Sequence, residues 1–256
     1  VSGGPNQTVT QVITDGQVLE TDHGNPLDFI ANYHSRFKVA LKPGLPRFCG
    51  GLAGYFGYDT IRYIEPRLAK HQLPDETHLP DIQLVLTEEL AVIDNLAGKL
   101  YLIVYANPEE SGSLEKAQAR LKTLRQSLDA SIQTPSTAPT KKTEAIRKFA
   151  KADFMDAVKR TKEYILAGDC MQVVIGQRIS QPYTDSPLSL YRALRSLNPS
   201  PYMYLYDFGD HQIVGSSPEI LVRQETKQVD GAKKRYVTVR PIAGTRPRGT
   251  SPEQDE

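Results

Sequence analysis

The sequence predicts an α+β protein in which antiparallel β-sheets are flanked by helices. Segments with the alternating residues of strands follow one another across short turns, as they do in hairpins. Helical stretches interrupt these runs, but they do not alternate regularly with single strands as the helices of a doubly wound α/β sheet do. The chain has 256 residues, of which 39% are hydrophobic and 24% charged, a composition typical of a globular protein with a sizeable core.

The first predicted elements are a hairpin and a helix. In TVTQVITDGQVLE, residues 8–20, apolar and polar side chains alternate around an Asp-Gly pair, which is a strong hairpin signal. In NPLDFIANYHSRF, residues 25–37, apolar residues recur at helical spacing, Asn25 is a suitable cap and Pro26 fits the first helical position. These features predict two strands followed by a short amphipathic helix.

Sheet elements and a second helix follow. FCGGLAGYFGYDTIRYIE, residues 48–65, is rich in glycine and aromatic residues, and residues 81–106 predict two β-rich segments around a turn at 95–98. Apolar residues line one face of a predicted helix at 113–128, with Ser113 as its cap.

A change in composition marks a boundary between two regions. IQTPSTAPTKKTE is poor in large apolar residues and rich in Thr, Pro and Ser, which is the composition of an exposed connection. We therefore predict an N-terminal region at 1–131, a linker at 132–147 and the start of a second domain at 148–256.

The second region is predicted to contain helices and an antiparallel run of strands. Asp153 is a suitable cap for a helix that Gly168 ends, and DCMQVVIGQRIS, residues 169–180, has the composition of a strand. Pro187 fits the first turn of another helix. Further strands are predicted over residues 202–208, 211–215, 220–225 and 236–242.

Charge and cysteine content argue against several classes of protein. The net charge is +1, from 31 basic and 30 acidic residues, and no segment combines basic with interleaved aromatic residues as a nucleic-acid surface does. Cys49 and Cys170 lie far apart, so neither a disulfide framework nor a zinc site is expected, and a reducing cytoplasm fits best. No apolar run approaches the ~18 residues of a membrane span. We expect neither nucleic acid nor a membrane as partner.

Two stretches place polar residues where they could act on a ligand. Glu219 follows Ser-Ser-Pro at the start of an apolar strand, and a carboxyl group at a strand's mouth can lie in a partly desolvated cleft and donate a proton near neutral pH. RPIAGTRPRG, residues 240–249, combines the backbone of Gly244, the hydroxyl of Thr245 and arginines that suit carboxylates. By position alone, an exposed glutamate and a surface loop are the commoner alternatives.

Five motifs, in order, resemble those of the anthranilate synthase component I family of chorismate-utilising enzymes. They are GGLAGYFGYD at 50–59, GDCMQVVIGQR at 168–178, NPSPYMYLY at 198–206, SSPEILVR at 216–223 and RPIAGTRPRG at 240–249. The resemblance covers most of the chain and implies the α+β fold of the chorismate-utilising enzymes, with its C-terminal part missing.

The resemblance implies an enzyme that converts chorismate and ammonia to anthranilate and pyruvate in tryptophan biosynthesis. Loss of the C4 hydroxyl of chorismate requires an acid, and Glu219 matches the family's general acid. Gln172 stands where related isochorismate and salicylate synthases carry a lysine that activates water, and an amide cannot serve as that base. Gly244 and Thr245 match residues that contact the substrate.

The resemblance also implies partners, a regulator and a metal. A glutamine amidotransferase subunit, component II, supplies the ammonia, and tryptophan acts as feedback inhibitor. Pro201, Tyr202 and Met203 match the part of the tryptophan pocket that this strand forms. Mg²⁺ is required, and its ligands are expected beyond Glu256. Because the chain opens on Val1 and lacks the family's C-terminal motifs, we expect a fragment that is inactive alone.

Three alternatives remain open. In component I of aminodeoxychorismate synthase a lysine replaces the alanine of the Pro-Ile-x-Gly-Thr motif, and this chain carries Ala243 at that position. A non-catalytic amino-acid-binding module of the same fold would bind tryptophan without converting chorismate. A structural role for residues 1–131, in docking the amidotransferase, is the third.

Overall fold

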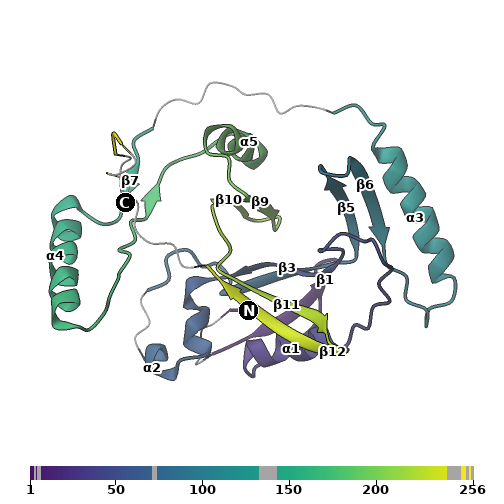
Figure 1. Cartoon of the computed structure of the whole chain (residues 1–256), viewed down its shortest axis with the longest axis horizontal. Coiled ribbons are helices and arrows are strands. Elements are labelled where there is room, and N and C mark those ends of the chain that lie inside the picture. Colours follow the sequence, from purple (N-terminus) through teal and green to yellow (C-terminus); the bar gives the residue numbers. More distant parts are fainter. Residues whose placement is uncertain are drawn as a thin grey trace. The chain divides into compact units, whose positions relative to one another are not determined.

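The computed structural model describes residues 1–2, 4, 7–70, 74–132, 143–240, 249–251 and 254. Within these ranges the strands form two-stranded antiparallel sheets accompanied by helices (Figure 1). The predicted α+β class is confirmed. The chain divides into two compact units, Val1–Ile132 and Gln133–Glu256, and the division falls at the start of the segment predicted as a linker.

In the first unit, the residues that the structure describes form three two-stranded sheets and several helices. In chain order its elements are β1 (Thr10–Thr14), β2 (Gln17–Asp22), α1 (Pro26–Ser35), β3 (Gly51–Phe56), the 3₁₀ helix η1 (Tyr58–Tyr63), α2 (Pro66–Ala69), β4 (Ile82–Thr87), β5 (Glu89–Asp94), β6 (Lys99–Val104) and α3 (Ser113–Ser127).

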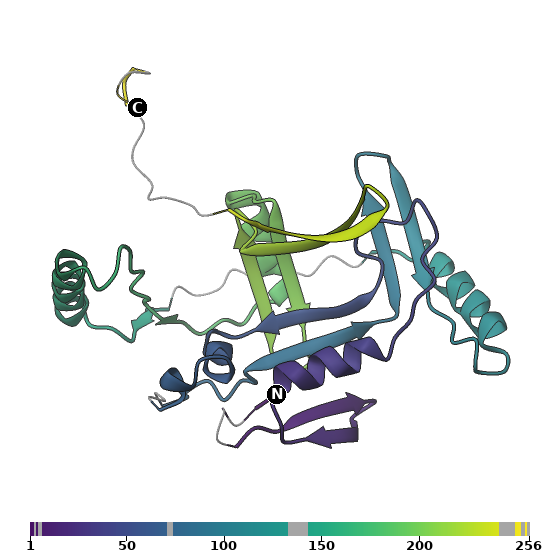
Figure 2. The same ribbon diagram turned by 60° about the horizontal axis from the view of Figure 1, so that its bottom comes forward.

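Local sequence chemistry explains the first elements of this unit. Asp15 and Gly16 have φ angles of 51° and 75°, the left-handed conformation that a two-residue hairpin turn requires between β1 and β2. The Asn25 side chain accepts a hydrogen bond of 2.9 Å from the Leu27 amide and caps α1. The predicted hairpin and the predicted cap are both confirmed. Figure 2 shows the hairpin and α1 in the purple part of the ribbon.

Two predictions for the first unit need correction. The first β-rich segment is not one strand but two, because β4 ends at Thr87 and β5 begins at Glu89. The cap of α3 is Gly112 rather than Ser113. Gly112 has a φ of 71°, which glycine adopts without steric cost, and Ser113 becomes the first helical residue.

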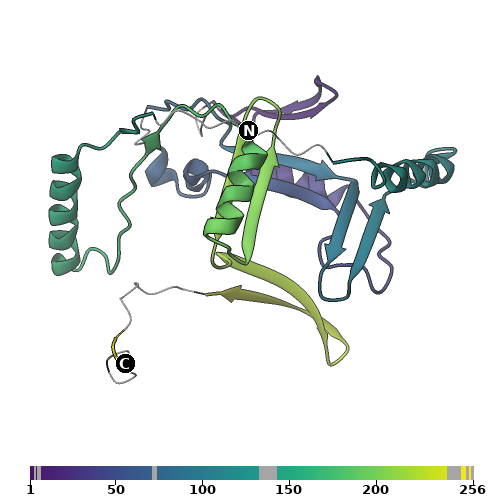
Figure 3. The ribbon, with the colours of Figure 1, turned by 90° about the horizontal axis from the view of Figure 1, so that it is seen from above.

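The described part of the second unit contains two helices and three two-stranded sheets. In chain order its elements are β7 (Ile146–Arg147), α4 (Lys151–Ala167), β8 (Ile179–Ser180), α5 (Pro187–Leu197), β9 (Tyr202–Asp207), β10 (Gln212–Ser217), β11 (Val222–Val229) and β12 (Ala232–Val239). Strand β7 occupies the last two residues of the segment predicted as a linker. Helix α5 packs against β9 and β10, as Figure 3 shows.

The ends of α4 confirm one prediction and correct another. Gly168 ends the helix with a φ of 83°, as predicted. The predicted Asp153 cap is wrong, because α4 begins at Lys151 after Ala150, which makes no side-chain capping bond. Asp153 lies instead in the first helical turn, where its negative charge favours the positive end of the helix dipole.

The strand predicted over residues 169–180 is wrong except for its last two residues. β8 pairs with β7, but the structure assigns no strand to residues 169–178. Residues 171–174 are exposed, and the apolar side chain of Val174 is 85% exposed. A strand needs a neighbour to receive its backbone hydrogen bonds, and the described part of the chain supplies none here.

Burial differs between the two units. Ile82, which is 1% exposed, lies in the core of the first unit. The buried residues of that unit are Thr8, Thr10, Pro26, Cys49, Thr60, Ile82 and Ala117. In the second unit, none of the residues that the structure describes is buried. Across all described ranges, no helix has the length and hydropathy to cross a membrane.

Candidate active site

The β9–β10 hairpin brings two of the predicted motifs together. Its antiparallel register pairs Tyr202 with Ser217 and Met203 with Ser216. Two of the three predicted tryptophan-binding residues, Tyr202 and Met203, are therefore the direct cross-strand neighbours of Ser217 and Ser216. Two stretches that are separated in the sequence meet at one end of this hairpin.

Glu219 lies in the turn that leads from β10 to β11. The Ser217 hydroxyl donates a hydrogen bond of 3.0 Å to the backbone carbonyl oxygen of Glu219 and closes the turn. Pro218 is exposed, whereas Glu219 is half-buried. The predicted acid therefore lies on a short connection between two hairpins, where it is partly shielded from solvent.

Two further hydrogen bonds tie this turn to the start of β9. The Ser216 hydroxyl donates to the carbonyl oxygen of Asn198 over 3.1 Å. The Nη2 atom of Arg223 on β11 donates to the Tyr202 hydroxyl over 3.1 Å. The second contact links the β11–β12 hairpin to β9. Arg223 is not among the predicted site residues, although it lies in the SSPEILVR motif.

The predicted tryptophan-binding residues do not all share one face. Tyr202 and Met203 are consecutive in a strand, so their side chains point to opposite sides of the hairpin. Pro201, before the strand, is exposed. The rings of Tyr204 and Tyr206 lie 5.5 Å apart, because alternate residues share a face. A ligand that contacts Tyr202 and Met203 together must therefore approach the end of the hairpin.

At the other end of this hairpin, the Asp207 carboxylate accepts hydrogen bonds at the turn between β9 and β10. The backbone amide of Gly209 and the side chain of Gln212 donate hydrogen bonds to Asp207, each of 3.0 Å. Because these bonds favour the ionised form, they lower the pKa of Asp207, with the amide of Gly209 the larger cause. This end holds the register of β9 and β10, on which the position of Glu219 depends.

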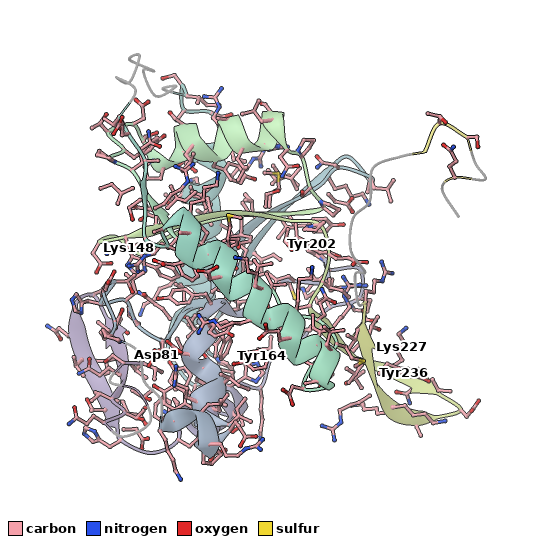
Figure 4. All side chains as sticks on the ribbon, turned by 90° about the vertical axis from the view of Figure 1, so that its left-hand side faces the viewer. Asp81, Lys148, Tyr164, Tyr202, Lys227 and Tyr236 are labelled. Carbon is pink, nitrogen blue, oxygen red and sulfur yellow. The ribbon has the colours of Figure 1, made fainter. Side chains whose placement is uncertain are left out.

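The β11–β12 hairpin carries a cation close to an aromatic ring. Lys227 Nζ lies 5.4 Å from the ring centroid of Tyr236. Figure 4 labels both residues and shows them beside one another on this hairpin. The contact is on strands that follow Glu219 in the sequence, and it helps to fix the two strands to one another.

Gln172, the other predicted catalytic residue, lies in an exposed segment without regular structure. A different glutamine, Gln177, anchors that segment. Its side-chain amide donates to the Phe149 carbonyl oxygen over 2.8 Å and accepts from the Phe149 amide over 3.0 Å. Gln177 therefore extends the pairing of β7 with β8. No local pattern in the sequence indicates this contact, which joins positions 28 residues apart.

The remaining predicted site residues lie outside the described residues. They are Gly244 and Thr245, together with Ala243. Their roles remain predictions.

The described residues do not form a metal site. Within those ranges, no group of three or more His, Cys, Asp or Glu side chains could hold a metal ion. These residues thus do not by themselves supply the ligand set of the Mg²⁺ that the resemblance implies.

Comparison with known proteins identifies the family. Residues 4–256 match the family described as chorismate binding enzyme. The chain belongs to this family. Among chorismate-binding enzymes, it is 52% identical over 247 residues to anthranilate synthase component 1 of Neisseria meningitidis serogroup B, covering 95% of this chain and 49% of that protein. It is 48% identical over 270 residues to the protein of the same name from Pseudomonas aeruginosa, covering 100% of this chain and 53% of the relative.

A solved structure supports the same family. The crystal structure of anthranilate synthase component I from Streptococcus pneumoniae superposes with a TM-score of 0.68 at 29% sequence identity, covering 87% of this chain and 52% of that one. The resemblance found in the five motifs is therefore confirmed, as is the fold of the chorismate-binding enzymes. The chain spans about half the length of the relatives it matches.

Proposed function

We propose that this chain is part of an anthranilate synthase component I, which converts chorismate and ammonia to anthranilate, pyruvate and water. The observation that carries the proposal is the 52% identity, over 95% of the chain, to a protein of that name. We further propose that a glutamine amidotransferase subunit supplies the ammonia and that tryptophan inhibits the enzyme. Cys49 and Cys170 are both free thiols, which suits a reducing cytoplasm.

In this proposal Glu219 is the general acid. The C4 hydroxyl of chorismate is a poor leaving group, so its carbon–oxygen bond breaks readily only when the oxygen receives a proton. The Glu219 carboxyl group donates that proton, and the oxygen departs as water. The position of Glu219, half-buried on the connection between two hairpins, supports the role.

The other predicted residues have roles in the choice of nucleophile, in substrate binding and in tryptophan binding. Gln172 carries a neutral amide and cannot activate water, which favours ammonia as the nucleophile. Gly244 and Thr245 contact chorismate. Pro201, Tyr202 and Met203 contribute to the tryptophan site. The Mg²⁺ ligands come from the part of the protein that these 256 residues do not include.

The test requires a polypeptide as long as the relatives. We define the extended polypeptide as this chain joined to the segments of the Neisseria meningitidis relative that it does not cover. It is supplied with chorismate, ammonia and Mg²⁺, and anthranilate is followed by its fluorescence. We expect the extended polypeptide to form anthranilate and the 256 residues alone to form none.

The decisive variant is Glu219→Gln in the extended polypeptide. We expect kcat to fall about 10²- to 10⁴-fold, the usual contribution of a positioned general acid, with unchanged thermal unfolding. Glu163→Gln on α4 is the matched control, because Glu163 is exposed, and it should keep the full rate. Full turnover by Glu219→Gln would refute the acid role.

The products distinguish the alternatives. Accumulation of aminodeoxychorismate in place of anthranilate would show that the enzyme is an aminodeoxychorismate synthase component I. That result would be unexpected, because this chain carries Ala243 where those relatives carry a catalytic lysine. Binding of tryptophan without any conversion of chorismate would identify a non-catalytic module.

A further inference from the structure

We propose that Arg223 is a positioning residue that holds the turn carrying Glu219 against the strand carrying Tyr202. The inference rests on the proposed function, since it concerns how Glu219 is presented to chorismate and how a ligand bound at Tyr202 acts on Glu219. Arg223 touches neither of the reacting groups in this scheme and acts through the position of the turn.

Hydrogen bonds hold the turn on both sides. On the β10 side, the Ser216 hydroxyl donates to the Asn198 carbonyl oxygen over 3.1 Å. On the β11 side, Arg223 Nη2 donates to the Tyr202 hydroxyl over 3.1 Å. Both acceptors belong to the segment that enters β9. Two hydrogen bonds, one from each side of the turn that carries Glu219, therefore connect this turn to the short segment that enters β9.

The Arg223 contact joins two separate sheets. Tyr202 belongs to the β9–β10 sheet and Arg223 to the β11–β12 sheet, and the two sheets share no ladder of backbone bonds. A turn between two such hairpins is not fixed by the ladders themselves. Side-chain bonds on its flanks therefore determine where Glu219 lies.

Tyr202 is accessible to a ligand. Its side chain is 40% exposed, although its hydroxyl accepts the bond from Arg223. A ligand that moves the Tyr202 ring lengthens or breaks this bond and so releases the turn. Ligand binding at Tyr202 and the position of Glu219 are then coupled, and such coupling acts equally in both directions.

The chemistry of the contact predicts which substitutions preserve it. A guanidinium group stays charged at every pH at which the enzyme works and donates a charge-assisted bond to the phenol oxygen. Lysine at position 223 also donates such a bond, whereas methionine has a similar length and donates none. Phenylalanine at position 202 keeps the ring but removes the acceptor.

The experiment is a double-mutant cycle in the extended polypeptide. Arg223→Met and Tyr202→Phe should each lower kcat about three- to tenfold, the effect of one lost hydrogen bond, with little change in KM. The double variant should fall no further, because each single change removes the same bond. Arg223→Lys should keep most of the rate. The tryptophan concentration for half-inhibition should rise in both single variants.

Controls separate positioning from stability. Arg235→Met changes an exposed arginine on β12 of the same hairpin and should keep the rate and the tryptophan response. A bond that served stability alone would lower the midpoint of thermal unfolding but leave kcat of the folded protein unchanged. Unchanged kcat in the single variants, or additive losses in the double variant, would overturn the positioning role.

The results that would refute the proposed function differ from those that would overturn the positioning role. It fails if the unmodified extended polypeptide forms no anthranilate, or if Glu219→Gln keeps its rate. Hydrogen–deuterium exchange of the 256-residue chain then decides the positioning role without turnover. Amides of residues 219–222 should exchange faster in Arg223→Met and in Tyr202→Phe, and equally fast in the double variant. Exchange rates that do not change would overturn the inference.

Discussion

At the scale of single residues, Tyr63 and Asp81 form a partly buried polar contact in the first unit. The Tyr63 hydroxyl donates a hydrogen bond of 2.7 Å to Asp81 Oδ2. Burial raises the pKa of Tyr63, and the bond to the Asp81 carboxylate raises it further, because a phenolate would lose the bond and repel the carboxylate. The folded protein thus holds this phenol in its neutral form.

The raised pKa of Tyr63 predicts that the first unit loses stability in alkaline solution. An unfolded tyrosine titrates with a pKa of about 10, whereas folded Tyr63 stays protonated to higher pH. The contribution is complete below that unfolded pKa and is lost as the pH rises toward the folded one. Tyr63→Phe should therefore flatten the decline in urea midpoint above about pH 10. Tyr58→Phe, at a side chain that is 95% exposed, should keep the original decline. Identical slopes for both variants would contradict this account.

The sequence predicted some site residues and missed others for a physical reason. Glu219 stood out because its motif fixes its position after Ser-Ser-Pro. The prediction that it begins a strand is wrong, because β11 starts only at Val222 and Glu219 lies in the connection before it. The Arg223 contact could not be predicted. Its acceptor, Tyr202, lies 21 positions away, and the bond depends on how two hairpins are arranged rather than on either local sequence.

At the scale of elements, boundaries were predictable where local chemistry decides them. The left-handed pair Asp15 and Gly16, the Asn25 cap and the Gly168 stop each act within a few residues, and all three are confirmed. The strand predicted at 169–180 depended on a partner elsewhere in the chain. Apolar composition shows that a segment can form a strand, but not that a neighbour will pair with it.

The Gln177 contact yields a prediction for this irregular segment. Gln177→Glu keeps the acceptor for the Phe149 amide but loses the donor to its carbonyl, and Gln177→Ala loses both. We expect the Phe149 amide to exchange with deuterium fastest in Gln177→Ala and at an intermediate rate in Gln177→Glu. Gln172→Ala is the matched control, since Gln172 is exposed in the same segment. Equal exchange in all variants would show that Gln177 does not anchor the segment.

At the scale of the whole molecule, the two units differ in how much they bury. The first unit has buried side chains from several parts of its sequence, including Cys49, Ile82 and Ala117. The described part of the second unit has none, and it exposes Leu197 by 85% and Leu221 by 88%. Burial of apolar surface is the main force that stabilises a folded unit. The first unit should therefore be the more resistant of the two to local unfolding in the 256-residue chain.

Limited proteolysis tests this difference directly. Proteases cleave segments that open locally, and opening is cheapest where few apolar contacts are lost. Trypsin should therefore degrade residues 143–240 first and leave a fragment whose mass corresponds to the first unit. Ile82→Ala removes a side chain that is 1% exposed and should cost about 2–4 kcal/mol, which abolishes the protection. Ile93→Ala, at a side chain that is 70% exposed, should leave the fragment intact. The prediction would be contradicted if trypsin degraded the first unit before the second. That result would mean that the buried residues of the first unit do not determine which unit opens.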